Sequence, residues 1–125
     1  MKKVLLAVLV LPFFSYKCDK AAKTVKDGFL KGKVVRISCA SFIVQVLNDD
    51  ALGEDGWKDM TNQDKAYDNV FTANNKCEMP AGVKAGAIIR FKIDEPTKND
   101  CVVCMMYDGP PKLKLDIKDI SILEK

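Results

Sequence analysis

Cysteines are the residues of this 125-residue chain whose type and spacing most directly imply chemistry. Four of the five, Cys39, Cys77, Cys101 and Cys104, follow a leader with the composition of an export signal. An even set of cysteines in a small exported domain is typical of disulfide bonds. We therefore predict two disulfides among these four residues, each stabilising the fold by about 2–4 kcal/mol.

The spacing of Cys101-Val-Val-Cys104 favours long-range disulfides over a local one. If the segment lies on or beside a strand, side chains three residues apart point to opposite faces, so each cysteine needs its own partner. Cys39 and Cys77 are the available partners. Four cysteines still allow three pairings, and the sequence leaves all of them open.

Two other chemistries remain open for the same cysteines. The two-residue gap between Cys101 and Cys104 suits a Zn²⁺ ion held by four thiolates, but zinc ribbons normally have two such pairs. Cys39 and Cys77 each stand alone. A redox-active pair usually opens a helix that lowers the thiol pKa, and the residues after Cys104 have no helical pattern. We expect disulfides in preference to either alternative.

The N-terminal residues follow the order of a signal peptide. Lys2 and Lys3 precede an almost wholly apolar stretch of eleven residues, Val4–Phe14, and polarity returns at Ser15. A transmembrane helix would need about 18 apolar residues or more. We therefore predict a signal peptide at residues 1–17 and a protein that is periplasmic, secreted or anchored to a membrane.

Cys18 lies where a bacterial lipoprotein carries its lipidated cysteine. A lipobox has a small residue before that cysteine and usually Leu three residues before it, whereas this chain has Lys17 and Ser15. Two fates of Cys18 stay open: a lipid anchor, or secretion with Cys18 removed, left free or joined to another thiol. We expect membrane contact only through such a lipid.

Strand patterns dominate the rest of the chain. Five segments have the alternating or β-branched composition of strands: residues 29–38, 42–47, 67–72, 89–94 and 113–122. The apolar positions change parity near Asp119, which predicts a bulge or bend. A weak capping pattern and the spacing of Trp57, Met60 and Tyr67 predict one short helix. Because closure removes exposed edges, these mainly antiparallel strands predict a small all-β Greek-key barrel.

In pattern the barrel region resembles an OB-fold, and small exported bacterial proteins that consist of one OB-like domain. The motifs GKVVRISCASFIVQVLN, AGAIIRFKIDEP and KLKLDIKDI carry the resemblance. We expect the barrel at residues 29–125, after an N-terminal tether at 18–28 that is made mainly of small and polar residues. One departure is that an OB-fold normally has a helix between its third and fourth strands, where this chain has the loop CEMPAGVKAG.

Composition argues against several activities. The chain has no histidine, which excludes Ser-His-Asp and Cys-His catalysis, and it has no P-loop or dinucleotide-binding glycine motif. Lys2, Lys3 and Lys17 account for the formal charge of +3, because the other 17 of the 20 basic residues balance 17 acids. A neutral body is not expected to bind nucleic acid. We expect a monomeric, non-catalytic binding module without a cofactor, for an unknown protein or small ligand.

Two regions are candidates for binding. Residues 49–68 have a local excess of five negative charges, which suits Ca²⁺ but lacks the order of acids in an EF-hand. Trp57, inside that stretch, is either an anchor for a partner or a plug for the barrel end. Met105, Met106 and Tyr107 form an adaptable apolar contact surface or pack within their loop.

A second hypothesis is an inhibitor. Netrin-like and metalloprotease-inhibitor domains are also disulfide-stapled OB barrels, and Cys18 at a processed N-terminus would resemble their zinc-capping cysteine. The dense N-terminal cysteine pattern of those families is missing from this chain.

Mass spectrometry of the exported protein tests these interpretations together. We expect all four body cysteines to be blocked as disulfides, without bound metal. A lipid on Cys18 would identify an anchored module, a free Cys18 would favour an inhibitor, and loss of Cys18 would exclude both. Full reaction of the four thiols with an alkylating reagent in the folded protein would contradict the disulfide prediction.

Overall fold

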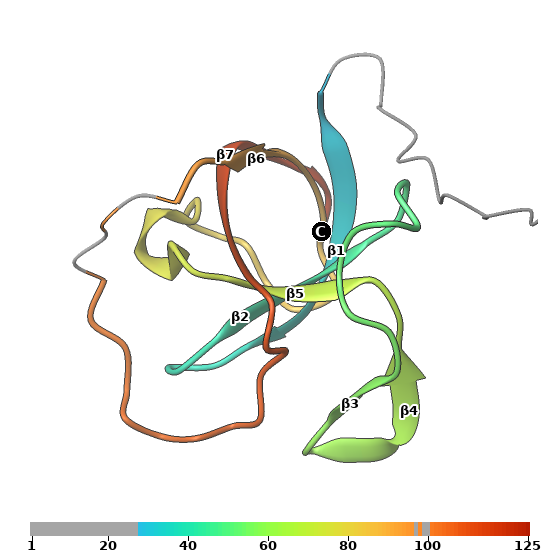
Figure 1. Cartoon of the computed structure of the whole chain (residues 1–125). Helices are drawn as coiled ribbons and strands as arrows, with labels where there is room; N and C mark the ends of the chain where they lie inside the picture. Colours follow the sequence, from blue (N-terminus) through green and yellow to red (C-terminus); the bar gives the residue numbers. More distant parts are fainter. Residues whose placement is uncertain (1–27, 97, 99–100) are drawn as a thin grey trace, which may run out of the picture.

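Five strands form a closed barrel, and two more form a hairpin beside it (Figure 1). This computed structural model describes residues 28–96, 98 and 101–125. The barrel strands are β1 (Leu30–Ile37), β2 (Phe42–Val46), β5 (Val70–Ala73), β6 (Ile88–Asp94) and β7 (Lys114–Glu124). The hairpin contains β3 (Trp57–Asp59) and β4 (Asn62–Tyr67), and the 3₁₀ turn η1 (Lys76–Glu78) precedes β6.

Several predictions about the N-terminus concern residues that the structure does not describe. The signal peptide at residues 1–17, Cys18 and residues 19–27 of the tether lie outside the described residues. Within the part that is described, no helix has the length and apolar character needed to cross a membrane.

The barrel has the strand order β1-β2-β5-β7-β6. Neighbouring strands are antiparallel except β5 and β7, which pair in parallel. If the five barrel strands are numbered 1 to 5 along the chain, their order around the barrel is 1-2-3-5-4. This is the strand order of an OB-fold. The predicted all-β, OB-like, disulfide-stapled barrel is therefore confirmed. The parallel pair arises because the long connection after β6 brings the chain back to the end of the barrel at which β5 begins.

One face of each barrel strand fills the interior. Along β1 the inward positions are Leu30, Gly32 and Val34, between lysines that reach solvent. Position 32 requires glycine, because a Cβ there would collide with the side chains of Val44 and Phe91. The other members of the buried core are Phe42, Val46, Phe71, Ala73, Ala87, Ile89 and Ile117. The two phenylalanine rings of Phe71 and Phe91 meet at a centroid distance of 5.8 Å.

The predicted bulge near Asp119 is confirmed. On β7, Lys118 faces Lys92 and Ser121 faces Arg90, so two β7 residues lie opposite one residue of β6. Asp119 has a φ of 52°, a left-handed conformation that is found at bulges. The bulge keeps the apolar residues on both sides of it directed at the barrel interior.

The predicted short helix is wrong, because residues 57–67 form the β3–β4 hairpin. Asp59 Oδ1 accepts hydrogen bonds from both the backbone N–H and the hydroxyl of Thr61, which stabilises a turn. Trp57 and Tyr67 then lie directly opposite each other across the hairpin, with ring centroids 6.0 Å apart. Their ten-residue separation fits a cross-strand pair as well as a helical stripe.

The third predicted strand is shifted along the chain. Sequence patterns place it at residues 67–72, whereas Tyr67 ends β4 and β5 covers Val70–Ala73. Asn69, with a φ of 59°, makes the turn between the two strands. Asparagine tolerates this conformation better than most residues do, so the chain reverses there.

Gly53 and Gly82 both have a positive φ but differ in the space around them. A Cβ added to Gly53 would lie 2.3 Å from the backbone of Asn69, whereas a Cβ added to Gly82 would have no atom within 4 Å. Alanine at the two positions therefore distinguishes the cost of backbone strain from that of a steric collision. We expect Gly53→Ala to lower the free energy of unfolding by about 3 kcal/mol or more, and Gly82→Ala by about 1 kcal/mol. Urea denaturation measures both losses, and equal values would contradict the packing described.

Candidate functional site

Two disulfides hold the segment before β7 against the barrel. Cys39 bonds to Cys104 and Cys77 bonds to Cys101, over sequence separations of 65 and 24 residues. The expected long-range pairing is therefore confirmed. Cys101 and Cys104 lie in coil rather than on a strand, and their partners differ because the segment passes η1 and then the β1–β2 turn (Figure 1). We call residues 101–113 the tethered segment.

This pairing bears on the zinc alternative. Each of the four sulfurs is bonded to another sulfur, so none of them is a free thiolate in this structure. Among the described residues, no group of three or more cysteine or acidic side chains is arranged to hold a metal ion.

A row of paired residues crosses the outer face of the barrel beneath the tethered segment. Arg36 of β1 lies opposite Ile43, Ile43 opposite Thr72, and Thr72 opposite Lys114. Arg36 reaches this face because β1 has a bulge after Val34. Without the bulge, Arg36 would share the inward face of Val34, since alternate residues of a strand point the same way.

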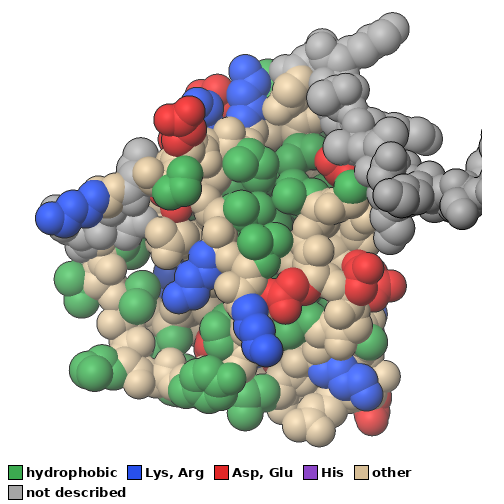
Figure 2. All heavy atoms as spheres, in the orientation of Figure 1, with side chains coloured by type: hydrophobic (Ala, Val, Ile, Leu, Met, Phe, Trp, Pro, Cys, Tyr) green, Lys and Arg blue, Asp and Glu red, His purple; other side chains and the backbone are tan. Residues whose placement is uncertain are grey.

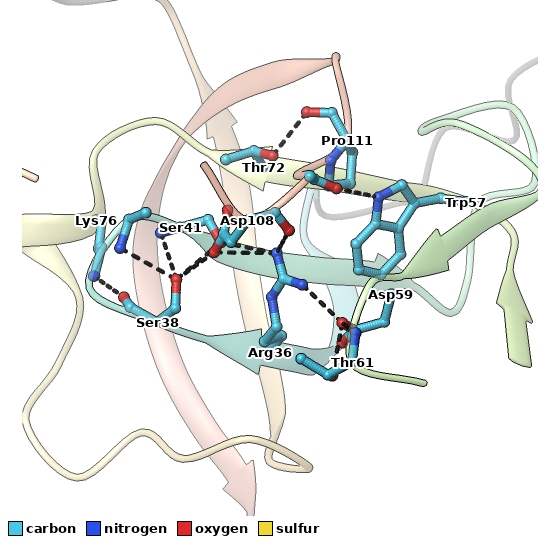
Figure 3. Close-up of polar contacts among 12 residues, drawn as sticks. Arg36, Ser38, Ser41, Trp57, Asp59, Thr61, Thr72, Lys76, Asp108 and Pro111 are labelled. Atoms are coloured by element: carbon cyan, nitrogen blue, oxygen red, sulfur yellow. Dashed lines mark hydrogen bonds and ion pairs between the residues drawn. The ribbon is translucent and has the colours of Figure 1, made fainter. Parts of the chain in front are cut away.

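Arg36 connects three parts of the chain (Figure 3). One guanidinium nitrogen donates to Asp59 of the hairpin at 2.8 Å, and another donates to the carbonyl oxygen of Asp108 at 2.7 Å. The second nitrogen also lies 3.1 Å from the Asp108 carboxylate, which accepts hydrogen bonds from Ser38 and Ser41 of the β1–β2 turn. The side chains of the two acids and of Arg36 are 10–12 % exposed. A buried cation between two anions thus holds the hairpin and the tethered segment to β1.

The surroundings of both acids favour the charged form. Burial raises the pKa of Asp59, but hydrogen bonds from Thr61 and Arg36 outweigh it and hold the pKa below its ordinary value. Burial also raises the pKa of Asp108, and hydrogen bonds from Ser38 and Ser41 together with the charge of Arg36 lower it by more. Both acids are therefore carboxylates at neutral pH.

Trp57 lies behind the tethered segment. Its indole Nε1–H donates to the carbonyl oxygen of Gly109 at 2.9 Å, and the Arg36 guanidinium lies 5.4 Å from its ring centroid (Figure 3). The side chain is half-buried and belongs neither to the barrel core nor to the fully exposed surface. Trp57 thus supports the tethered segment and does not plug the barrel.

Further hydrogen bonds continue along the same segment. The Thr72 hydroxyl donates to the carbonyl oxygen of Pro111, and Glu54 accepts the backbone N–H of Leu113. These contacts lay the segment over the outer face of β2 and β5, where Ile43 is fully buried. In OB-folds this strand face, between the corresponding loops, binds oligonucleotides and oligosaccharides. Here the chain's own tethered segment covers it.

The exposed apolar residues of the segment lie between its attachment points. Val102 and Val103 separate the two disulfides, and Met105–Tyr107 separate Cys104 from Asp108. Met105 is fully exposed, and Val102 and Tyr107 are 91 % and 82 % exposed. Figure 2 shows hydrophobic side chains gathered along the lower edge, where the tethered segment runs. The structure leaves the consecutive side chains of Met105, Met106 and Tyr107 exposed, and it places Trp57 against Gly109, two residues further along the segment.

A small cavity opens beside the segment. It measures about 130 Å³ and lies between the β1–β2 turn, β5, η1 and the start of β7. Its walls are formed by Ala40, Thr72, Ala73, Asn74, Lys76, Cys101, Val103, Pro110 and Lys114.

Besides Asp59, three of the seven acids of residues 49–68 accept hydrogen bonds from backbone within or next to this stretch. Asp49, Asp55 and Asp68 accept the N–H groups of Ala51, Asn69 and Gly56. The Asp49 contact, two residues along, is that of an Asx turn, whereas Asp55 and Asp68 accept from backbone 14 and 12 residues away. The loop that sequence analysis considered for Ca²⁺ thus uses these three carboxylates to shape its own backbone.

Comparison of the chain with protein-family models, curated proteins and solved structures found no match. The resemblance to small exported OB-like proteins therefore stays a prediction. Arg36, Asp59 and Asp108 were not among the site residues predicted from the sequence. One signal was present, because Arg36 continues the parity of Leu30, Gly32 and Val34 and so places a charge where an apolar residue is expected.

Removing Arg36 tests the charge network. At pH 7, Arg36→Met leaves two buried carboxylates without their cation, so we expect a loss of about 3–5 kcal/mol in unfolding free energy. In the wild type, both lowered carboxyl pKa values stabilise the fold above about pH 4, and this contribution is lost as the pH falls through the folded-state values. In the variant, burial without the cation raises these pKa values, so the difference from wild type should shrink toward acid pH.

Lys118→Met is the matched control. Lys118 pairs with Asp94 at 3.0 Å with both side chains partly exposed to solvent, so its loss should change stability far less than the loss of Arg36. Chemical denaturation from pH 3 to 7 measures both variants. Equal losses, or a difference for Arg36→Met that does not depend on pH, would contradict a buried charge network.

Proposed function

We propose that this protein is a non-catalytic binding module that contacts another protein through the apolar surface of the tethered segment. The single observation that supports the proposal is the alternation of attachment points with exposed apolar side chains. Val102, Met105 and Tyr107 reach solvent from backbone that the disulfides and Arg36 hold in place.

The composition of this surface favours a protein partner. Methionine and tyrosine are enriched at protein interfaces, where the flexible thioether adapts to the partner and the aromatic ring supplies contact area. Contiguous exposed apolar residues cost free energy in water, and in soluble proteins they usually mark an interaction site. A connection that served only to close the barrel would be expected to carry polar residues at these positions.

The attachments also favour tight binding. A segment held on both sides loses little conformational freedom when a partner binds, so more of the contact energy is retained as affinity. The three residues Met105–Tyr107 lie between a covalent bond and an ion pair. The covered β2–β5 face directs binding to the outer side of the tethered segment and away from the site that other OB-folds use.

Export completes the proposal. Two intramolecular disulfides fit an oxidising environment, because thiols of cytosolic proteins are kept reduced. We place the protein outside the cytosol, as the N-terminal sequence predicts. Lipidation of Cys18 and the inhibitor hypothesis both depend on residues outside the described part of the chain and stay predictions.

Site-specific photocrosslinking tests the proposed surface. A photoreactive residue at position 105 should crosslink one partner protein in intact cells, whereas the same residue at Leu123, which is exposed on β7, should not. Met105→Ser and Tyr107→Ser should each weaken binding of the identified partner by about tenfold or more. Because both side chains are exposed, stability should change by about 0.5 kcal/mol or less.

Leu123→Ser is the control for binding and for solubility. The proposal fails if position 105 yields no partner, if positions 105 and 123 yield the same products, or if Met105→Ser and Tyr107→Ser leave binding unchanged. Crosslinking to a second copy of the chain would also contradict it.

A further inference from the structure

We propose that the cavity beside the tethered segment binds the oxyanion of a small ligand, a carboxylate, phosphate or sulfate group held between Lys76 and Lys114. The site is distinct from the proposed protein-contact surface and shares only Val103 with it. Neither the strand patterns nor the proposed function requires it.

The charge of the cavity wall supports an anionic ligand. Lys76 and Lys114 are the charged members of the described lining, and both are cationic. Lys76 Nζ donates to the carbonyl oxygen of Ser38 in the β1–β2 turn, which also supplies Ala40 of the wall, and this leaves two of its three N–H donors for a ligand. Two cations that face one small cavity repel each other, and an anion between them replaces that repulsion with attraction.

The uncharged residues of the wall are consistent with an anionic ligand. The Thr72 hydroxyl donates to the carbonyl oxygen of Pro111, so its hydrogen is already used. Ala40, Ala73, Val103 and Pro110 form the apolar part of the wall, and Asn74 adds an uncharged polar residue. Recognition would thus depend on the two ammonium groups.

The size of the cavity limits the ligand. A volume of about 130 Å³ is close to that of an engineered apolar cavity of about 150 Å³ that binds benzene, so the space is that of one small group. One carboxylate, phosphate or sulfate group fits this space. A whole nucleotide or sugar chain does not, so any larger ligand must extend outward past Val103 or Lys114.

The disulfides keep the cavity formed in the absence of ligand. Cys101 is part of the wall and is bonded to Cys77, next to Lys76. Ala40 is part of the wall and follows Cys39, which is bonded to Cys104. Both sides are therefore fixed covalently, and an anion need not order the segment in order to bind.

Heteronuclear NMR of the disulfide-bonded wild type tests the site directly. Inorganic phosphate, sulfate and acetate are titrated separately at constant low ionic strength, with chloride as the reference anion. We expect saturable shifts of the amides of Asn74, Lys76 and Cys101 with at least one of the three anions. The acetate arm separates a carboxylate site from one for tetrahedral anions. Shifts that do not saturate, or that spread over all exposed lysines, would overturn the proposal.

Lysine variants provide the second measurement. Lys76→Met and Lys114→Met should each weaken binding of that anion by about tenfold, and the double variant should abolish it. Lys112→Met is the matched control, because Lys112 is exposed on the same segment but does not line the cavity. Its affinity should stay within about twofold of wild type. Retained binding in the double variant, or an equal loss in Lys112→Met, would overturn the proposal, whereas the wild-type titration decides the case if a variant does not fold.

Discussion

The guanidinium of Arg36 is the contact on which the arrangement of the site depends. It pairs with Asp59 of the hairpin and Asp108 of the tethered segment, and both anions are nearly buried. A buried charge is tolerated only when opposite charges and hydrogen bonds surround it, so the three elements must meet at one place. The serines of the β1–β2 turn complete the set by donating to Asp108. The outer face of the barrel is organised around this one cation.

The disulfides and the Arg36 network do different physical work. A disulfide over 65 residues mainly restricts the unfolded chain, and it fixes Cys104 beside Cys39 without determining how the following residues run. The contacts of Asp108, Gly109 and Pro111 determine that path, because each places one backbone carbonyl on a particular partner. Together they allow Met105–Tyr107 to remain exposed on a segment that is held at both ends.

Two features that depend on residues close together in the sequence were predicted correctly, whereas two that depend on pairing between strands were not. Alternation in β6 and the change of parity near Asp119 depend on neighbouring residues, and the structure confirms both. The hairpin at residues 57–67 was mistaken for a helix because Trp57 and Tyr67 meet across strands, a relation that spacing alone does not reveal. The parallel pairing of β5 with β7 depends on the path of a long connection, which no local pattern specifies.

The amino-acid sequence by itself determined the fold class of this protein, an all-β domain with disulfides. Alternating apolar residues favour a β-sheet with one buried face, and an even set of cysteines in a small domain favours covalent crosslinks. Tertiary structure alone decided the pairing of Cys39 with Cys104 and the outward turn of Arg36 at the bulge after Val34. The physical reason is that hydrophobic alternation acts over two or three residues, whereas an ion pair or a disulfide joins residues 23 to 72 positions apart, whose meeting depends on how the whole barrel closes.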